Sequence, residues 1–176
     1  AAAVTCCALL VPQGDAETIR RRTLGHQGLV VGEVLSKLII VGVADPVPAI
    51  RCAVMSRLDA RFDQFLAQTE YLKSLFIAIN DQDLAVRESA IRNLGRLVAL
   101  NPAFIMPTLR KTIVHLLTEL EYSSVADERA ASARLLGHLV SAAPNFVKPY
   151  VSPRHFWWFR SLSFFYGNSF FSAQLL

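Results

Sequence analysis

The chain has 176 residues, 53% of them hydrophobic and 18% charged, with a formal net charge of +4. This composition excludes a disordered chain and predicts one ordinary domain with a buried core. The positive excess lies near the two ends, at Arg20–Arg22 and at Arg154 and Arg160. The centre is therefore nearly neutral, which argues against the cationic stripe of a nucleic-acid-binding protein.

The first segment, Ala1–Gly25, shows no recognisable repeat pattern. Its first eleven residues are apolar, but they lack the basic start of a signal peptide. The missing initiator Met suggests that the chain begins inside a longer one. Three cysteines without zinc-ligand spacing fit a reducing compartment better than a disulfide scaffold; they are Cys6, Cys7 and Cys52.

From His26 onward the apolar residues recur at helical spacing, and no segment alternates with period two. The expected helices are His26–Val41, Pro46–Leu58, Phe62–Ile79 with a break near Gln68 and Thr69, Leu84–Leu100, Ala103–Glu121, Ala126–Ala142 and Asn145–Val151. Asp45 is expected to cap the helix that Pro46 opens, and Asp81 or Asp83 the helix after it. Pro107 and Pro149 are expected to cause a kink or a delayed helix start.

The helices fall into repeated pairs. Asp45–Leu58 aligns with Asp81–Leu94 at an offset of 36, and Arg87–Leu109 aligns with Arg129–Val151 at an offset of 42. A unit of about 40 residues is typical of helical-pair repeats. We therefore predict an all-α fold, an α-α superhelix with repeats at 26–58, 59–100 and 101–143 and the start of a fourth at 144–153. In the second repeat we expect a polar face opposite the apolar one, made of Arg87, Glu88, Arg92, Asn93 and Arg96.

The last segment, 154–176, does not continue the pattern, because nine aromatic residues occur within His155–Leu176. Such a stretch approaches the length of a membrane span, but Arg160, Gly167 and Asn168 interrupt it. A tail of foreign sequence or a poorly ordered end is the favoured interpretation.

The repeats resemble HEAT repeats, in which an Asp in the turn within each pair and an Arg opening the second helix form ladders between repeats. The stretches VLSKLIIVGVADPVPAIR, LDARFDQFLAQTEYLKSLFIAINDQ, GRLVALNPAFIMPTLRKTIVHLLTELE and SARLLGHLVSAAP also resemble the N-terminal HEAT region of the target-of-rapamycin (TOR) protein kinases, from about Val34 to Pro153. The resemblance implies ladder positions at Asp45, Arg51, Asp81, Arg87 and Arg129. Ser123 stands where the third aspartate would be, unless Asp127 substitutes for it.

No residue pattern indicates catalysis or a cofactor. The sequence has no Gly-rich phosphate loop and no acidic metal pair beside an Asn, so we expect this segment not to be an enzyme. Asp81 and Asp83 are interpreted as helix caps rather than as a metal site. None of the histidines shares spacing with cysteines or carboxylates, and His115 is interpreted as a solvated side chain. Cys52 is interpreted as a buried thiol.

Two basic rows have helical spacing: Arg51, Arg57 and Arg61, and Arg87, Arg92 and Arg96. They could recognise an acidic peptide, a phosphorylated segment or nucleic acid. We favour a solvated face with an inter-repeat ladder, because acidic neighbours neutralise the rows; these are Asp59, Asp63 and Glu88.

The resemblance implies a cytoplasmic, non-catalytic scaffold segment of a serine/threonine kinase in nutrient and growth signalling, whose complexes act at lysosomal and other endomembrane surfaces. Its partners would be Raptor-type and Rictor-type subunits and the TOR dimer partner, with no nucleic acid and no membrane span. A generic HEAT adaptor, of the transport-receptor or phosphatase-scaffold kind, and a HEAT-like nucleic-acid binder or base-repair enzyme are the alternatives. Because a short array lacks neighbours at both ends, we also expect a marginal, aggregation-prone segment.

Overall fold

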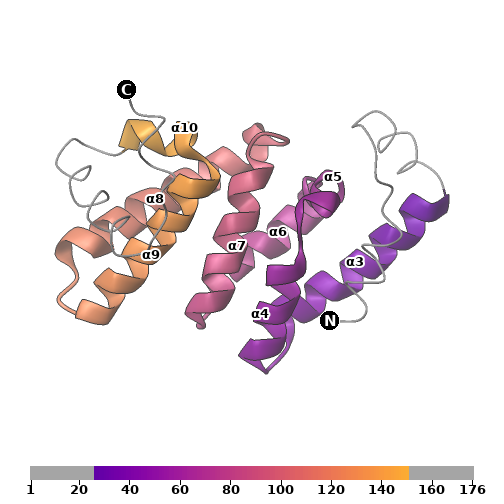
Figure 1. The fold of residues 1–176 in the computed structure, drawn as a ribbon, viewed down its shortest axis with the longest axis horizontal. Coiled ribbons are helices and arrows are strands. Elements are labelled where there is room, and N and C mark those ends of the chain that lie inside the picture. The colour runs from indigo at the N-terminus through magenta and orange to yellow at the C-terminus, as the bar shows by residue number, and fades with distance from the viewer. Residues whose placement is uncertain (1–25, 151–176) are drawn as a thin grey trace. The chain divides into compact units, whose positions relative to one another are not determined.

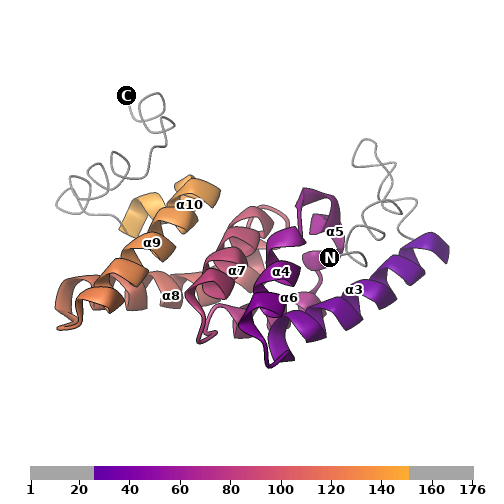
Figure 2. The same cartoon turned by 60° about the horizontal axis from the view of Figure 1, so that its bottom comes forward.

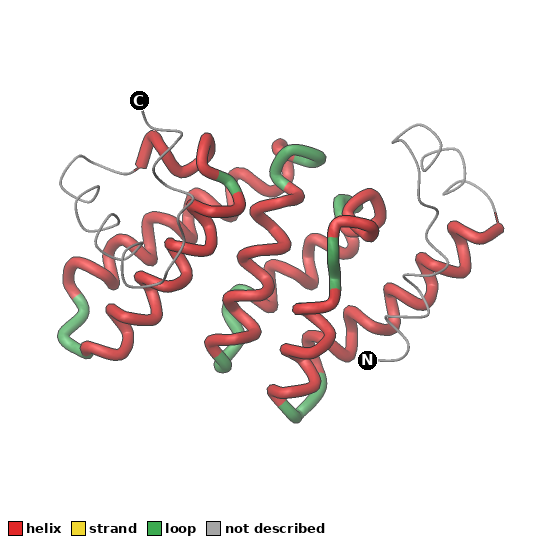
Figure 3. The backbone as a smooth tube through the Cα atoms, in the orientation of Figure 1, coloured by secondary structure: helices red, strands yellow, loops and turns green. Residues whose placement is uncertain are grey.

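A computed structural model describes residues 26–150, and in that range every regular element is a helix, joined to the next by short loops and turns, without a strand (Figure 3). The α-helices are α3 His26–Ala44, α4 Pro48–Arg57, α5 Asp63–Leu66, α6 Thr69–Ala78, α7 Leu84–Leu97, α8 Pro102–Tyr122, α9 Ala126–Ala142 and α10 Pro144–Val147. Single 3-10 turns occupy Ala60–Phe62 and Lys148–Tyr150. The all-α, helical-repeat class predicted from the sequence is confirmed.

The helix positions agree closely with the sequence pattern. α9 has the predicted bounds, and the break expected near Gln68 separates α5 from α6. α8 begins at Pro102 and continues through Pro107, so the delayed start expected at that proline is wrong. The expected helix Asn145–Val151 is instead the short α10 followed by a 3-10 turn that contains Pro149.

The start of α4 also corrects a prediction. Pro48 is the first helical residue and Val47 is the N-cap, with no side-chain capping bond, so Asp45 is not the cap and Pro46 lies outside the helix. Val47 precedes a proline, which disfavours helical backbone, and its φ of −92° and ψ of 112° are extended. Two prolines two residues apart therefore move the helix start to the second one.

The chain divides into two compact units, residues 1–111 and 112–176. In the first unit α3 packs against α4 and α6, and α7 packs against both α4 and α6, as Figures 1 and 2 show from two directions. One ridge of each helix supplies the core, for example Val31, Leu35 and Ile39 of α3, which are almost fully buried. Burying a side chain of this size contributes about 1.5–3 kcal/mol.

The break between α5 and α6 is held by polar contacts. Asn101 Nδ2 donates to the Ala67 carbonyl at 2.9 Å, which satisfies a group that the interrupted helix leaves without its usual partner. Tyr71 Oη, in α6, donates to the Gly32 carbonyl of α3 at 2.9 Å. These two bonds fix the position of the broken first helix of the second pair.

In the second unit, α9 packs against α10. The buried apolar residues of α9 recur at helical spacing, at Leu135, Leu136 and Leu139. Val147 of α10 is also buried. Ser132 Oγ donates to a Glu119 carboxylate oxygen and so joins α9 to the end of α8 within this unit.

Among residues 26–150, no helix combines the length and the apolarity that crossing a membrane requires. Two predictions lie outside the described residues. They concern the unassigned segment 1–25 and the aromatic tail 154–176, for which a membrane span was the alternative interpretation.

Candidate functional site

The same turn precedes the second helix of each pair. Its first residue accepts a hydrogen bond from the backbone N–H two residues later. Asp45 Oδ1 accepts from Val47 N at 2.8 Å, and Asp81 Oδ1 accepts from Asp83 N at 2.8 Å. In the second unit Ser123 Oγ accepts from Val125 N at 3.2 Å. Short polar side chains stabilise turns in this way, and the recurrence matches the offsets of 36 and 42 residues.

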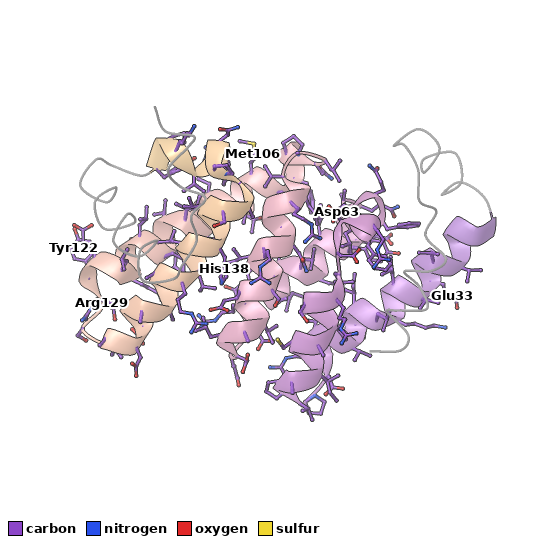
Figure 4. All side chains as sticks on the ribbon, viewed as in Figure 1. Glu33, Asp63, Met106, Tyr122, Arg129 and His138 are labelled. Atoms are coloured by element: carbon purple, nitrogen blue, oxygen red, sulfur yellow. The ribbon has the colours of Figure 1, made fainter. Side chains whose placement is uncertain are left out.

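An arginine six residues after the start of the turn closes it in two of the three cases. Arg51 NH1 donates to the Asp45 carbonyl at 2.7 Å, and Arg129 NH1 donates to the Ser123 carbonyl at 2.9 Å. The side chain of Arg129 is labelled in Figure 4. Each of these arginines ties the start of its helix back to the preceding turn.

Arg51 also binds the next repeat. Its Nε donates to Asp81 Oδ2 at 2.8 Å, and its NH2 donates to Asp81 Oδ1 at 2.7 Å. Only 11% of the Arg51 side chain and 8% of the Asp81 side chain are exposed. Two parallel charge-assisted hydrogen bonds between nearly buried side chains fix both the distance and the angle between the guanidinium and the carboxylate. The pair therefore links the turn and second helix of the first repeat to the turn of the second repeat.

The electrostatics follow from this geometry. Hydrogen bonding to Arg51 lowers the pKa of Asp81, against the opposing effect of burial, and the bond from Asp83 N–H and the charge of Arg87 lower it further. The same contact raises the pKa of Arg51. Both groups therefore stay charged at neutral pH.

Asp83, the neighbour of Asp81, is the N-cap of α7. Its Oδ1 accepts from Ala85 N at 2.9 Å and from Val86 N at 3.3 Å. The two carboxylates of this turn are thus occupied by a helix end and by an arginine, which suits structural roles. Among residues 26–150 no group of three His, Cys, Asp or Glu side chains is placed to hold a metal ion.

A second polar clamp joins the same two repeats near the end of α4. Arg96 NH2 and Nε bind the two oxygens of Asp63 at 2.8 Å and 3.2 Å, and NH2 also donates to the Leu58 carbonyl at 3.0 Å. Asn93, which is 3% exposed, donates to the Met55 carbonyl at 2.9 Å and accepts from Arg96 NH1 at 3.0 Å. Asp63 is labelled in Figure 4.

Three of the six arginines in the two basic rows form ion pairs within the chain. Arg51 binds Asp81, Arg96 binds Asp63, and Arg61 binds Asp59. Of the six arginines, only Arg57 and Arg92 are classed as exposed without an ion pair among the described residues. The geometry therefore favours the ladder and ion-pair interpretation over a continuous recognition surface for anions.

The predicted polar face of α7 is wrong at two positions. Glu88 is 8% exposed and Asn93 is 3% exposed, so both belong to the buried part of the helix. α7 packs against α4 and α6 together, which covers more of its surface than an amphipathic pattern suggests. One signal was present in the sequence, an Asn one position before the buried Leu94, but this pattern does not distinguish a buried amide from a solvated one.

The remaining candidate residues show no reactive arrangement. His115 is 67% exposed and lies 3.3 Å from Glu119, four residues later on the same helix. Ser132 donates to that same Glu119, so the carboxylate stands between the hydroxyl and the imidazole. Cys52 is half-buried and not in a disulfide, so the prediction of a buried thiol is wrong.

No protein-family model matches the chain. Individual relatives do match. The chain is 46% identical over 151 residues to the serine/threonine-protein kinase tor1 of Schizosaccharomyces pombe, a match that covers 86% of this chain. The chain belongs to the TOR family. It is also 39% identical to the serine/threonine-protein kinase TOR2 of Saccharomyces cerevisiae over 86% of the chain, and 39% identical to mTor of Drosophila melanogaster over 70%.

The similarity to TOR proteins extends further along the chain than the Val34–Pro153 stretch on which the resemblance was first seen, because the match to tor1 includes 151 residues. The chain spans only about 6% of the length of these TOR relatives.

Proposed function

We propose that this TOR segment is a non-catalytic scaffold that helps to position the subunits of a TOR complex. One observation carries the proposal. In a chain that resembles TOR kinases across most of its length, Arg51 of the first helical pair binds both carboxylate oxygens of Asp81 in the second pair. Stacked helical pairs present long surfaces to other proteins. In this view the segment sets the distance between a recruited protein and a kinase domain elsewhere in the parent chain.

The ion pairs that arginines and aspartates form within the chain support a structural role. The Arg51–Asp81 pair bridges the first two repeats, and Arg96, which binds Asp63 within the second repeat, also donates to the Leu58 carbonyl of the first. Such contacts fix the relative angle of consecutive helical pairs, which a scaffold needs. The chain spans only about 6% of the length of its TOR relatives, so most of what those proteins contain lies outside the matched region. We therefore infer that any phosphoryl transfer by the parent protein is carried out by other parts of it.

The proposed partners are Raptor-type and Rictor-type subunits and a second TOR chain, in the cytoplasm and at endomembrane surfaces. The test is co-precipitation of the tagged 176-residue chain with each purified subunit, after circular dichroism has shown that the chain is helical. Binding to either subunit supports the proposal. A helical, monomeric chain that retains neither subunit nor a second TOR chain contradicts it.

A generic adaptor is the second candidate, since the repeats alone suit many protein partners. Retention of unrelated acidic or helical proteins at the same affinity as a TOR-complex subunit would favour it. Nucleic-acid binding is tested by an electrophoretic mobility shift at two salt concentrations. We expect no shift, because three of the six arginines in the two rows are already paired with aspartates within the chain.

A further inference from the structure

The turn between α8 and α9 carries a serine whose hydroxyl group is accessible. Ser124 is exposed, and its Oγ makes no hydrogen bond among residues 26–150. The neighbouring Ser123 is half-buried, and its Oγ already donates to a Glu128 carboxylate oxygen. The turn lies shortly before Arg129, which is labelled in Figure 4. Of the two adjacent hydroxyls, the one on Ser124 is therefore the one that a modifying enzyme can reach.

Carboxylates flank this serine on both sides. Segment 119–128 contains no Lys or Arg and four acidic residues, which are Glu119, Glu121, Asp127 and Glu128. Asp127 lies three residues after Ser124, is exposed, and has no hydrogen bond or ion pair within the described part of the chain. An acid at this spacing suits a protein kinase whose substrate cleft carries Arg and Lys side chains, because these pair with carboxylates.

The structure distinguishes Ser124 from two other residues with the same spacing. An acid three residues after a Ser or Thr occurs at three places in the sequence, namely Ser56, Thr118 and Ser124. Ser56 lies in α4 and donates to the Ala53 carbonyl at 3.3 Å, and Thr118 lies in α8 and donates to the Val114 carbonyl at 2.8 Å. Such bonds hold a hydroxyl against its own helix. Because a kinase binds its substrate as an extended segment, both helices would have to unwind, whereas Ser124 already lies in a turn.

The residues that follow Ser124 are also easier to extend. α9 begins after the N-cap Val125, which makes no side-chain capping bond. A capping side chain contributes about 1 kcal/mol, so the first turn of α9 opens more readily than a capped one. The acid that follows Ser56 is less available, because both oxygens of Asp59 are bound by Arg61.

We propose that Ser124 is a phosphorylation site for an acidophilic serine/threonine protein kinase that recognises Asp127, with ATP as the phosphoryl donor. A bond forms between Ser124 Oγ and the γ-phosphorus while the bond from that phosphorus to the β–γ bridging oxygen breaks. ADP leaves, and the hydroxyl proton passes to the catalytic aspartate of the kinase. The phosphate adds roughly −1.5 to −2 charges, so it strengthens the negative charge of segment 119–128 by nearly half. The modification thereby changes the surface that this turn presents to other proteins.

The experiment uses the 176-residue chain, shown to be helical by circular dichroism, with magnesium ATP and casein kinase 2 as the acidophilic kinase. Tandem mass spectrometry identifies the modified residues, and phosphate incorporation gives the rate. We expect Ser124 to be the main site and Ser124→Ala to remove most of the incorporation. The matched controls Ser56→Ala and Thr118→Ala should leave the rate unchanged. A helical chain that gains no phosphate at Ser124, or gains it equally fast at Ser56 or Thr118, overturns the proposal.

A second set of variants tests the recognition of Asp127. Asp127→Asn keeps the size of the side chain but removes its charge, and we expect the rate at Ser124 to fall at least roughly fivefold. Asp127→Glu keeps the charge and should keep most of the rate, and circular dichroism establishes that both variants are helical. An unaltered rate in Asp127→Asn would overturn the proposal, because the kinase would then not read this acid. The scaffold function is tested separately by co-precipitation and does not depend on this outcome.

Discussion

The Arg51–Asp81 pair offers a sharp test of what holds the first two repeats together. Replacing Asp81 with Asn keeps the side-chain oxygen that accepts from Asp83 N, but it removes the charge and one of the two acceptors of Arg51. A hydrogen bond to a charged group contributes about 1.5–3 kcal/mol, and solvent at the open edge reduces this value. We therefore expect Asp81→Asn to lower the free energy of unfolding by about 2 kcal/mol.

Asp45→Asn is the matched control. Asp45 makes the same turn bond to Val47 N, and its carboxylate receives no arginine among the described residues, since Arg51 binds its backbone carbonyl instead. We expect this variant to change the free energy of unfolding by less than about 0.5 kcal/mol. Both values come from urea denaturation at neutral pH, followed by circular dichroism. Equal losses in the two variants would show that the Asp81 contribution belongs to the turn and not to the ion pair.

The pH dependence provides a second criterion for the same pair. The folded-state pKa of Asp81 is lowered by Arg51, so the unfolded chain takes up the proton first as the pH falls. The stabilising effect of the ionised Asp81 carboxylate is complete above its pKa in the unfolded chain, which is about 3.9. This effect is lost as the pH falls through the lower pKa that Asp81 has in the folded chain. The stability difference between the unaltered chain and Asp81→Asn should therefore shrink as the pH falls below about 4. A difference that stays constant down to the lowest measurable pH would refute the electrostatic reasoning.

Three further predictions concern packing and burial. Gly137→Ala should stabilise the chain by about 0.5–1 kcal/mol, because a Cβ there meets no atom within 4 Å. Gly42→Ala should destabilise it by about 1 kcal/mol, because its Cβ would lie 3.0 Å from Cγ1 of Val54, a β-branched side chain that cannot easily turn away. Thermal melts of the two glycine variants check both signs. Tyr71→Phe should lower the free energy of unfolding by about 1 kcal/mol, because it removes the hydrogen bond to the Gly32 carbonyl of α3. Burial raises the pKa of Tyr71, so ultraviolet titration should show a tyrosine that ionises above the usual range and that is absent from the variant. The 176-residue chain should be marginally stable and prone to aggregate, since Leu29 and Ile40 of α3 are 71% and 60% exposed; a sharp melt of soluble monomer at high temperature would contradict this.

Much of the fold could be predicted from local sequence. Apolar residues at helical spacing gave the helix positions, and α9 was placed at its observed bounds. The offset of 36 residues placed Asp45 with Asp81 and Arg51 with Arg87, and the structure shows the same turn bond at both aspartates. Such features are local: a proline, a short polar side chain or a ridge of leucines acts within a few residues of itself.

The tertiary structure decided how the polar side chains are used. Arg51 and Arg87 stand at equivalent positions in the sequence, yet Arg51 forms two bonds with Asp81 while the Nε of Arg87 is buried without a partner among residues 26–150. Asn93 and Asp63 acquired their roles only when α7 packed against α4 and α5, because their partners lie more than thirty residues away in the chain. Periodicity reports which face of a helix is apolar, but the number of helices that cover it, and the donors and acceptors they bring, depend on packing between distant segments. The sequence by itself therefore determined the helices and their repetition, and the packing of one pair against the next determined which charges became links between repeats.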